Sequence, residues 1–255
     1  MELNKIYNMD CLEGMKMLDD TSIDMILADL PYQITACSWD SIIPLEPLWK
    51  QYKRVIKDNG AIVLTASQPF TTKLINSNMD WFKYDLVWSK HQVTGFLQAK
   101  KRPLREHEDV LLFYKKQPTY NPKMRKGKMQ LKNTGGSAKI YGGGCSNPHY
   151  SDKYYPKSIL NFPLRRFKNG HPTQKSVDLF EYLIKTYTNK NEIVLDNVIG
   201  SGTTAVACLK TDRKFIGFEQ EEKYYNIALK RIGKFNKKYY EQLPEKEKPA
   251  KLQLF

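Results

Sequence analysis

Short apolar runs alternate with amphipathic stretches along most of this chain. Runs of strand length lie at residues 3–8, 23–28, 61–66, 82–88, 107–114, 192–196 and 214–219. Stretches with helical spacing lie at residues 11–18, 46–57, 69–76, 173–187, 203–211 and 221–234. Because buried strands that alternate with helices are typical of parallel sheets, the pattern predicts an α/β fold with a mostly parallel sheet of seven strands. The runs 82–88 and 107–114 follow each other with no helix between them.

Breaks in this pattern predict how the chain is divided. Asp58-Asn59-Gly60 is expected to end the helix at 46–57, in which Pro47 is tolerated in the first turn. Periodicity fails between residues 115 and 167, where glycines, lysines and tyrosines are frequent. We therefore predict four segments, which are 1–114, an insert at 115–170, 171–234 and a charged tail at 235–255.

Acidic side chains follow four of the predicted strands. Asp10, Asp29, Asp196 and Glu219 each stand at or just beyond the carboxyl end of a different apolar run. In open α/β sheets ligands bind outside the carboxyl ends of the strands, where the strand order reverses. The pattern therefore predicts that these four carboxylates gather on one rim and form a binding site.

The charge of the chain is concentrated in one block. The formal net charge is +14, and residues 90–175 hold 19 Lys or Arg against 4 Asp or Glu. The rest of the chain is nearly neutral, with 22 basic and 23 acidic residues. A solvated surface is the simple explanation of a charge run, but a basic block confined to one segment is the pattern that phosphate binding requires. We favour a nucleic-acid partner.

The cysteines and the hydropathy exclude several classes of protein. Cys11, Cys37, Cys145 and Cys208 show no metal-ligand spacing, so we expect reduced thiols, no metal and a cytoplasmic location. No apolar run is long enough to cross a bilayer, and no signal peptide is recognisable.

Two motifs carry candidate chemistry. Asp29-Leu30-Pro31-Tyr32 resembles the Asp-Pro-Pro-Tyr motif of amino-group DNA methyltransferases, with Leu30 in place of the first proline. The stretch from Asp196 to Thr204, which contains Gly200-Ser201-Gly202, resembles the S-adenosylmethionine-binding loop of that family. The catalytic motif comes first and the cofactor loop last, which is similar to the beta group of the family. The resemblance covers residues 3–232 and implies a Rossmann-like methyltransferase sheet of seven strands, parallel except for one hairpin partner. It also implies that the basic insert recognises the target.

The resemblance implies a set of cofactor contacts. Glu219 would bind the ribose hydroxyls, and Asp10, with the amide of Cys11, the adenine edge. Asp196 and Gly200 would lie near the methionine part, Gly202 in the same loop, and Thr203 or Thr204 near the carboxylate. Asp29 is a further candidate cofactor contact. Lys175 is similar to a segment that completes the pocket. A strand-end turn or helix cap is the alternative for Asp10. A dinucleotide site is a rival for the whole set because Glu219 follows Asp196 by 23 residues.

The catalytic tetrapeptide suggests how an amino group is methylated. The amino nitrogen of adenine is a poor nucleophile because its lone pair is delocalised into the ring. If Asp29 and the carbonyl of Leu30 accept its two hydrogens, the lone pair is exposed for in-line transfer. Pro31 stiffens the loop, and Tyr32 would stack on the flipped base, with Trp39 and Phe70 as further walls. Core packing is the alternative for Tyr32.

We therefore expect a site-specific enzyme that methylates the 6-amino group of adenine in double-stranded DNA. Candidate DNA contacts are Lys90, Arg102, Arg105, Arg125, Arg165 and Arg166. The alternatives are a cytosine-N4 or RNA methyltransferase, a DNA-binding protein whose catalytic loop has decayed, and a nicotinamide-dependent oxidoreductase. The third glycine of the dinucleotide fingerprint is missing, which disfavours the last. A homodimer and a cognate restriction enzyme are compatible partners, but the recognition sequence is not legible in these residues.

Overall fold

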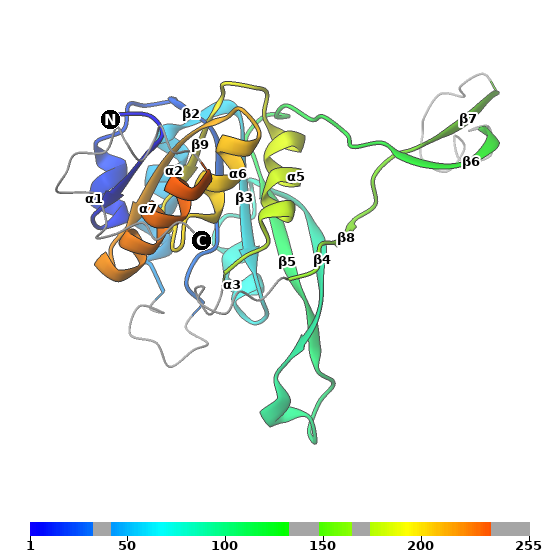
Figure 1. Cartoon of the computed structure of the whole chain (residues 1–255), viewed down its shortest axis with the longest axis horizontal. Helices are drawn as coiled ribbons and strands as arrows, with labels where there is room; N and C mark the ends of the chain where they lie inside the picture. The colour runs from blue at the N-terminus through cyan, green and yellow to red at the C-terminus, as the bar shows by residue number, and fades with distance from the viewer. Residues whose placement is uncertain (33–41, 133–147, 165–173, 236–255) are drawn as a thin grey trace. The chain divides into compact units, whose positions relative to one another are not determined.

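Eight strands from distant parts of the chain form one sheet in a computed structural model of the protein (Figure 1), which describes residues 1–32, 42–132, 148–164 and 174–235. In spatial order the strands are β1 (Lys5–Asn8), β10 (Lys214–Glu219), β9 (Ile193–Asp196), β2 (Ile23–Ala28), β3 (Ile56–Ala66), β5 (Arg105–Phe113), β4 (Phe82–Thr94) and β8 (Ile159–Asn161). Only β5 runs antiparallel to its neighbours β3 and β4. The predicted mostly parallel α/β sheet with one hairpin is confirmed, and β8 adds an eighth strand to the expected seven.

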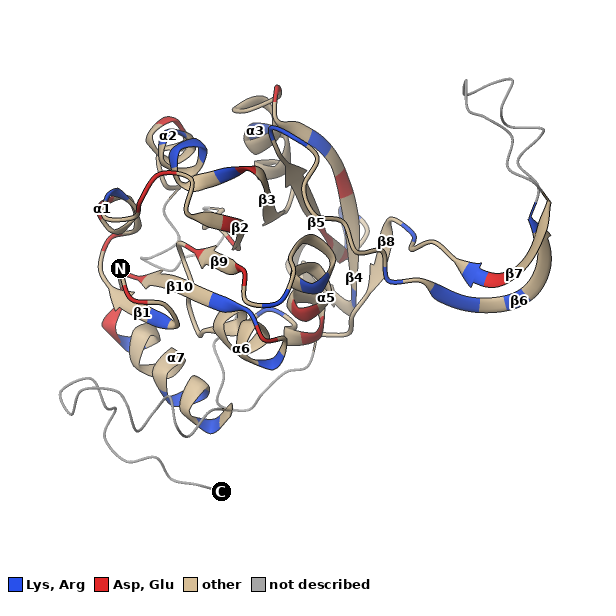
Figure 2. Ribbon diagram, turned by 90° about the horizontal axis from the view of Figure 1, so that it is seen from above, with Lys and Arg blue, Asp and Glu red and all other residues tan. Residues whose placement is uncertain are grey.

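Helices cover both faces of this sheet (Figure 2). One face carries α1 (Cys11–Lys16), α2 (Leu45–Val55) and α3 (Phe70–Asn76), and the other carries α5 (Val177–Tyr187), α6 (Thr203–Lys210) and α7 (Glu222–Phe235). In β2, Met25 and Leu27 pack on the second group of helices, whereas Ile26 and Ala28 pack on the first. A strand buried on both faces has no polar face, which explains the continuous apolar run in the sequence.

The boundary between α2 and β3 differs from the prediction. The helix ends at Val55, Ile56 is already extended, and Asp58-Asn59-Gly60 lies inside β3 rather than in a helix stop. The carboxylate of Asp58 accepts the ammonium groups of Lys115 and Lys116 at 2.7 Å, so it faces solvent from the strand. The pairing register of β2 and β3 shifts between Ile23 and Met25, which accommodates the polar residues.

The start of α5 also differs from the prediction. The helix begins at Val177, with Ser176 at the N-cap position but without a capping bond from its side chain. Of the predicted helix 173–187, Thr173 lies outside the described residues. None of the helices in the ranges that the structure describes is long and apolar enough to span a membrane.

The segment without periodicity contains strands that the sequence did not reveal. Residues Asn121–Lys157 form a second compact unit with a two-stranded antiparallel sheet of β6 (Arg125–Lys132) and β7 (His149–Tyr154). Seven of the eight side chains of β6 are exposed, so no apolar alternation marks the strand. Residues 158–164 belong to the first unit, where β8 pairs with β4. The second unit is therefore narrower than the predicted insert at 115–170.

Candidate active site

Four carboxylates lie at the carboxyl ends of four neighbouring parallel strands. Asp196 and Glu219 are the last residues of β9 and β10, Asp29 follows β2 directly, and Asp10 follows β1 by two residues. These strands are adjacent in the order β1-β10-β9-β2. The predicted gathering of the acids on one rim is confirmed, and the strand order turns back at β9 and β2, where ligands of such sheets bind.

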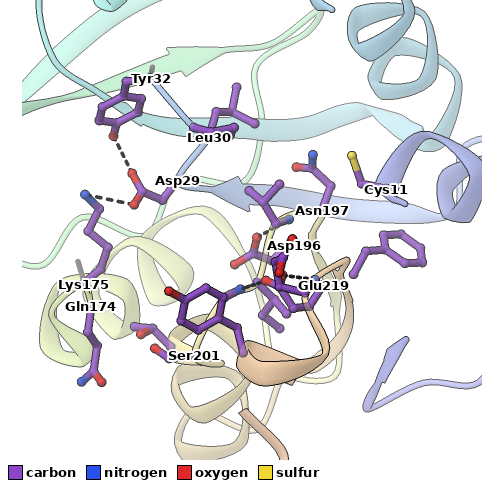
Figure 3. Close-up of a pocket in the computed structure, with 18 of the residues that line it drawn as sticks. Cys11, Asp29, Leu30, Tyr32, Gln174, Lys175, Asp196, Asn197, Ser201 and Glu219 are labelled. Carbon is purple, nitrogen blue, oxygen red and sulfur yellow. Dashed lines mark hydrogen bonds and ion pairs between the residues drawn. The ribbon is translucent and has the colours of Figure 1, made fainter. Parts of the chain in front are cut away.

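A cavity of about 400 Å³ opens on this rim (Figure 3). Its volume is within the range of small-molecule sites. Of the residues predicted from the two motifs and their partners, it is lined by Asp10, Cys11, Asp29, Leu30, Pro31, Tyr32, Lys175, Asp196, Gly200, Thr203 and Glu219. Two segments about 170 residues apart in the sequence, the Asp29 loop and the Gly200 loop, thus share one crevice.

The carboxylate of Glu219 is fixed by backbone amides. The N–H of Gly200 donates to Oε2 at 2.9 Å, and the N–H of Glu221 donates to Oε1 at 2.8 Å. Burial raises the pKa of Glu219 above its ordinary value. Gly200 has φ +53°, and a Cβ there would meet only the carbonyl oxygen of Val198, at an ordinary contact distance of 3.9 Å. The loop therefore leaves room for a ligand beside an oriented acid.

Asp196 holds the glycine loop in place through hydrogen bonds to both of its carboxylate oxygens. It is 3% exposed, and its two oxygens accept the N–H of Val198 at 3.1 Å and the hydroxyl of Thr204. Burial raises the pKa of Asp196 to about 7. Thr204 is fully buried and does not line the cavity. Of the two threonines predicted near the cofactor carboxylate, Thr203 lies on the cavity wall, and the hydroxyl of Thr204 orients Asp196.

Gly202 serves helix packing rather than ligand approach. It has φ +79° at the N-cap of α6, and a Cβ there would lie 3.1 Å from Cβ of Ala228 in α7. It does not line the cavity, so its prediction as a cofactor contact gains no support from the cavity wall. The guanidinium of Arg231 in α7 donates to Ser201 and to the Thr203 hydroxyl at 2.9 Å, which holds the loop against that helix.

Asp10 lines the cavity and also caps α1. Its Oδ1 accepts the N–H groups of Leu12 at 2.8 Å and Glu13 at 3.1 Å. Burial raises the pKa of the neighbouring Cys11 thiol to about 11, so the thiol is not a reactive nucleophile. Both roles considered for Asp10 are compatible, because capping occupies one carboxylate oxygen.

Asp29 is the centre of a hydrogen-bonded network (Figure 3). The hydroxyls of Tyr32 and Thr65 both donate to its Oδ1 at 2.5 Å, and the ammonium of Lys175 lies 3.0 Å from its Oδ2. A carboxylate has about four acceptor positions. The described residues occupy three of them, which leaves one on the side of the cavity.

Lys175 connects Asp29 to a second ion pair. Its ammonium lies 2.7 Å from Oε2 of Glu108, whose Oε1 lies 3.0 Å from the ammonium of Lys90. Burial alone would lower the pKa of Lys175, but Asp29 and Glu108 outweigh it and raise that pKa. Likewise Lys175 and Lys90 outweigh burial and lower the pKa of Glu108. Two acids and two bases thus neutralise one another inside the cavity wall.

This network corrects the interpretation of Lys90 as a DNA contact. Lys90 is 5% exposed and paired with Glu108, so it is not available to a phosphate on the surface.

Sequence reasoning missed Glu108 and Thr65, although Glu108 is one of only four acids within the basic block. No signal in the sequence indicated Thr65, which lies in the buried strand β3.

The other tetrapeptide residues are packed around Asp29. The ring of Tyr32 stacks on Phe70 with centroids 5.2 Å apart, and Phe70 is buried behind it rather than on the cavity wall. The Leu30 side chain is 3% exposed in the core, so the departure from the family's proline is accommodated by packing. Trp39 lies outside the described residues.

The remaining predicted DNA contacts lie in different places. Arg102 is exposed near the tip of the β4–β5 hairpin, and Arg125 is exposed in β6 of the second unit. Arg105 is half-buried, and its guanidinium donates to Ser67 and to the carbonyl of Gln68 at 3.2 Å. Arg165 and Arg166 lie outside the described residues.

An open α/β sheet in this strand order, with a glycine loop after β9 and an acid at the end of β10, belongs to the class that binds its ligand outside the carboxyl ends of the strands. The chain belongs to the DNA methylase family that comprises the N6 and N4 types. Its sequence matches that family over residues 23–230.

The names of similar proteins agree with this family assignment. The chain is 26% identical to the type II methyltransferase M1.MboII of Moraxella bovis over 89% of this chain and 96% of that protein. It is 28% identical to the DNA adenine methyltransferase YhdJ of Escherichia coli K12, over 91% and 83%. The crystal structure of an M1.HpyAVI–SAM complex superposes with a TM-score of 0.62 at 28% identity and covers 89% of this chain and 98% of that one.

Proposed function

We propose that this protein transfers a methyl group from S-adenosylmethionine to the exocyclic 6-amino nitrogen of adenine in double-stranded DNA. The observation that carries the proposal is the single cavity in which the Asp29 tetrapeptide faces the Gly200 loop. The relative with an adenine-specific name, at 28% identity, supports adenine as the target base.

The donor set of the cavity fits the methyl donor. Glu219 presents an oriented carboxylate that suits ribose hydroxyls, and Asp10 presents a second acid at the neighbouring strand end. Gly200 leaves its backbone open to the cavity, and Thr203 places a hydroxyl at the start of α6. When bound, S-adenosylmethionine supplies an electrophilic methyl group on a positively charged sulfur. Asp196 shapes the loop that receives it.

Asp29 and Leu30 would activate the target amino group. The remaining acceptor position of Asp29 takes one amino hydrogen, and the backbone carbonyl of Leu30 takes the other. The nitrogen then pyramidalises and its lone pair becomes available. Lys175 and Thr65 keep the Asp29 carboxylate oriented, so that it stabilises the positive charge that develops on the nitrogen. As the nitrogen–carbon bond forms, the bond between the methyl group and the sulfur would break and leave S-adenosylhomocysteine. The methylated nitrogen would then lose one proton to water.

The target base has to leave the duplex before it reaches Asp29. A base inside the stack cannot present its amino group to a cavity, so the proposal requires base flipping. Tyr32, backed by Phe70, offers an aromatic surface at the cavity wall for the flipped base. The basic second unit, with eight Lys or Arg and one acid in residues 121–157, is the proposed target-recognition segment.

One experiment separates this function from its alternatives. Purified protein is incubated with unmethylated duplex DNA and radiolabelled S-adenosylmethionine, and the nucleosides are then separated. We expect the label in N6-methyladenine, and none with Asp29→Ala. Label in N4-methylcytosine, or in RNA but not DNA, would replace the proposal by one of its enzyme alternatives. DNA binding without label would indicate a decayed enzyme.

Two partners beyond DNA are also proposals. A homodimer is tested by light scattering of the purified protein with and without DNA. A cognate restriction enzyme is tested by asking whether extracts of the source cells cut unmethylated DNA but not DNA treated with this protein.

A further inference from the structure

The tip of the β4–β5 hairpin has no role in the proposed reaction. The two strands extend together away from the rest of the sheet and end in a short 3-10 helix, Phe96–Gln98 (Figure 1). Both strands are fixed where the hairpin leaves the sheet, because Gln92 donates to the carbonyl of Leu164 at 2.6 Å and Arg105 to that of Gln68 at 3.2 Å. The hairpin is therefore anchored to the body of the first unit.

The tip is folded but leaves its apolar side chains uncovered. Backbone bonds from Gln98 to Gly95 at 2.8 Å, and from Lys101 to Gln98 at 2.8 Å, close the turn. Nevertheless Phe96 is 64% exposed and Leu97 is 100% exposed. Single exposed apolar residues are common on protein surfaces. Two adjacent ones on an ordered protruding turn indicate a surface that is covered by a partner.

The tip begins at the edge of the cavity. Lys90 and Thr94 in β4 line that cavity, and Leu97 follows Thr94 by three residues. Three residues of extended chain span at most about 10 Å. That reach corresponds to about three steps of the DNA stack. A duplex whose target base enters the cavity therefore lies within reach of Phe96 and Leu97.

The charge around the tip identifies the partner. Lys100, Lys101 and Arg102 follow the apolar pair and are exposed, and no acidic residue occurs between Gln92 and Arg105. Cationic side chains beside an apolar wedge suit the phosphates and stacked bases of a nucleic acid. A protein partner would not require this concentration of one sign of charge.

We propose that Phe96 and Leu97 enter the duplex beside the target adenine and fill the space that the flipped base leaves. Lys100, Lys101 and Arg102 hold the flanking phosphates. The wedge takes over the stacking that the adenine provided inside the duplex, so it favours the extrahelical base. This inference rests on the proposed function and names the part of the chain that opens the duplex.

The test compares a Phe96→Ala/Leu97→Ala variant with a matched control, Met17→Ala/Met79→Ala, whose side chains are 58% and 55% exposed outside the hairpin. The first probe is a duplex of the recognition sequence, as read by methylation sequencing, with 2-aminopurine at the target position. The wild type and the control should raise its fluorescence at saturating protein, and the tip variant should not. Cofactor affinity and thermal melting of the tip variant should match those of the wild type.

Kinetics on two further duplexes decide the role. On a fully paired duplex, kcat/KM of the tip variant should fall about tenfold or more, and a mismatch opposite the target adenine should restore most of it, because a mismatched base is cheaper to extrude. Wild-type kinetics on the paired duplex, a loss that the mismatch does not relieve, or a change of oligomeric mass would each overturn the proposal. If the wild type labels neither duplex, the proposed function fails instead.

Discussion

Three side chains fix the position of the Asp29 carboxylate before substrate binds. Two hydroxyls, from Tyr32 and Thr65, and the ammonium of Lys175 fix its carboxylate, and Glu108 and Lys90 in turn hold Lys175. Charges that are arranged in advance need no reorganisation when charge develops on a substrate. Leu30 fits this arrangement because its side chain is buried and its proposed role uses only the backbone carbonyl.

The acid at the end of β10 should control cofactor affinity. In Glu219→Ala the oriented carboxylate is removed, and a hydrogen bond to a charged group contributes about 1.5–3 kcal/mol, so the dissociation constant of S-adenosylmethionine should rise about 10- to 100-fold. Calorimetric titration measures it. Glu222→Ala, at the exposed start of α7, removes the same charge outside the cavity and serves as the control. An unchanged constant in Glu219→Ala would refute the ribose role.

The raised pKa of Asp196 predicts a pH dependence of stability. Since burial raises this pKa from 3.8 to about 7 in the folded state, the folded protein keeps a proton that the unfolded chain loses. The associated stability, on the order of 4 kcal/mol, is fully present below about pH 4 and is lost as the pH rises through about 7.

Asp196→Asn removes this titration and isolates its effect. Between about pH 5 and about pH 8 the free energy of unfolding of the wild type should fall more than that of the variant, as measured by urea unfolding. If the free energy of unfolding varies with pH in the same way for the two proteins, Asp196 is ionised over this whole pH range and the account of its burial is contradicted.

At the scale of elements, the ends of strands were predictable and the contacts between them were not. Apolar runs marked β2, β9 and β10, and the acids that follow them indicated the rim. In contrast, the partners of Lys175 and of the glycine loop, Glu108 and Arg231, come from β5 and α7. Such pairs depend on the packing of distant elements, which local periodicity does not encode. β6 was missed because both of its faces are exposed.

The two glycines of the cofactor loop should respond differently to alanine. Both have positive φ, which costs about 1–2 kcal/mol for a side chain. At Gly202 the new Cβ also meets Ala228 of α7 at 3.1 Å, and overpacking adds about 1–3 kcal/mol. Gly202→Ala should therefore destabilise the fold more than Gly200→Ala in urea unfolding. Equal destabilisation by the two substitutions would show that α6 and α7 do not pack against each other through Gly202.

At the scale of the whole molecule, the charge and the catalytic machinery occupy different parts of the chain. The cavity belongs to the first unit, and in its wall Asp29 and Glu108 are neutralised by Lys90 and Lys175. The second unit, Asn121–Lys157, has one acid against eight Lys or Arg. Composition alone located this block, because charge counts need no knowledge of the fold. Its two strands and its narrower borders required coordinates.

Lysines of the second unit should set the salt dependence of DNA binding. In Lys126→Gln/Lys128→Gln/Lys153→Gln, three exposed charges are removed, and the slope of log K against log salt should become shallower by about 0.9 for each phosphate that is no longer neutralised. Fluorescence anisotropy with duplex DNA measures it. The control Lys223→Gln/Lys230→Gln/Lys234→Gln removes the same charge from α7. Equal slopes in the two variants would show that net charge, not the second unit, attracts DNA.

The central claim is that the Asp29 loop and the Gly200 loop form one crevice that methylates the amino group of adenine. Its most direct test is nucleoside analysis and methylation-sensitive sequencing of DNA from methylation-deficient cells that express either the wild type or Asp29→Ala. We predict N6-methyladenine within one short sequence for the wild type and none for the variant, although the variant still binds S-adenosylmethionine. Methylated adenine in both samples, or methylated cytosine in the first, would contradict this claim.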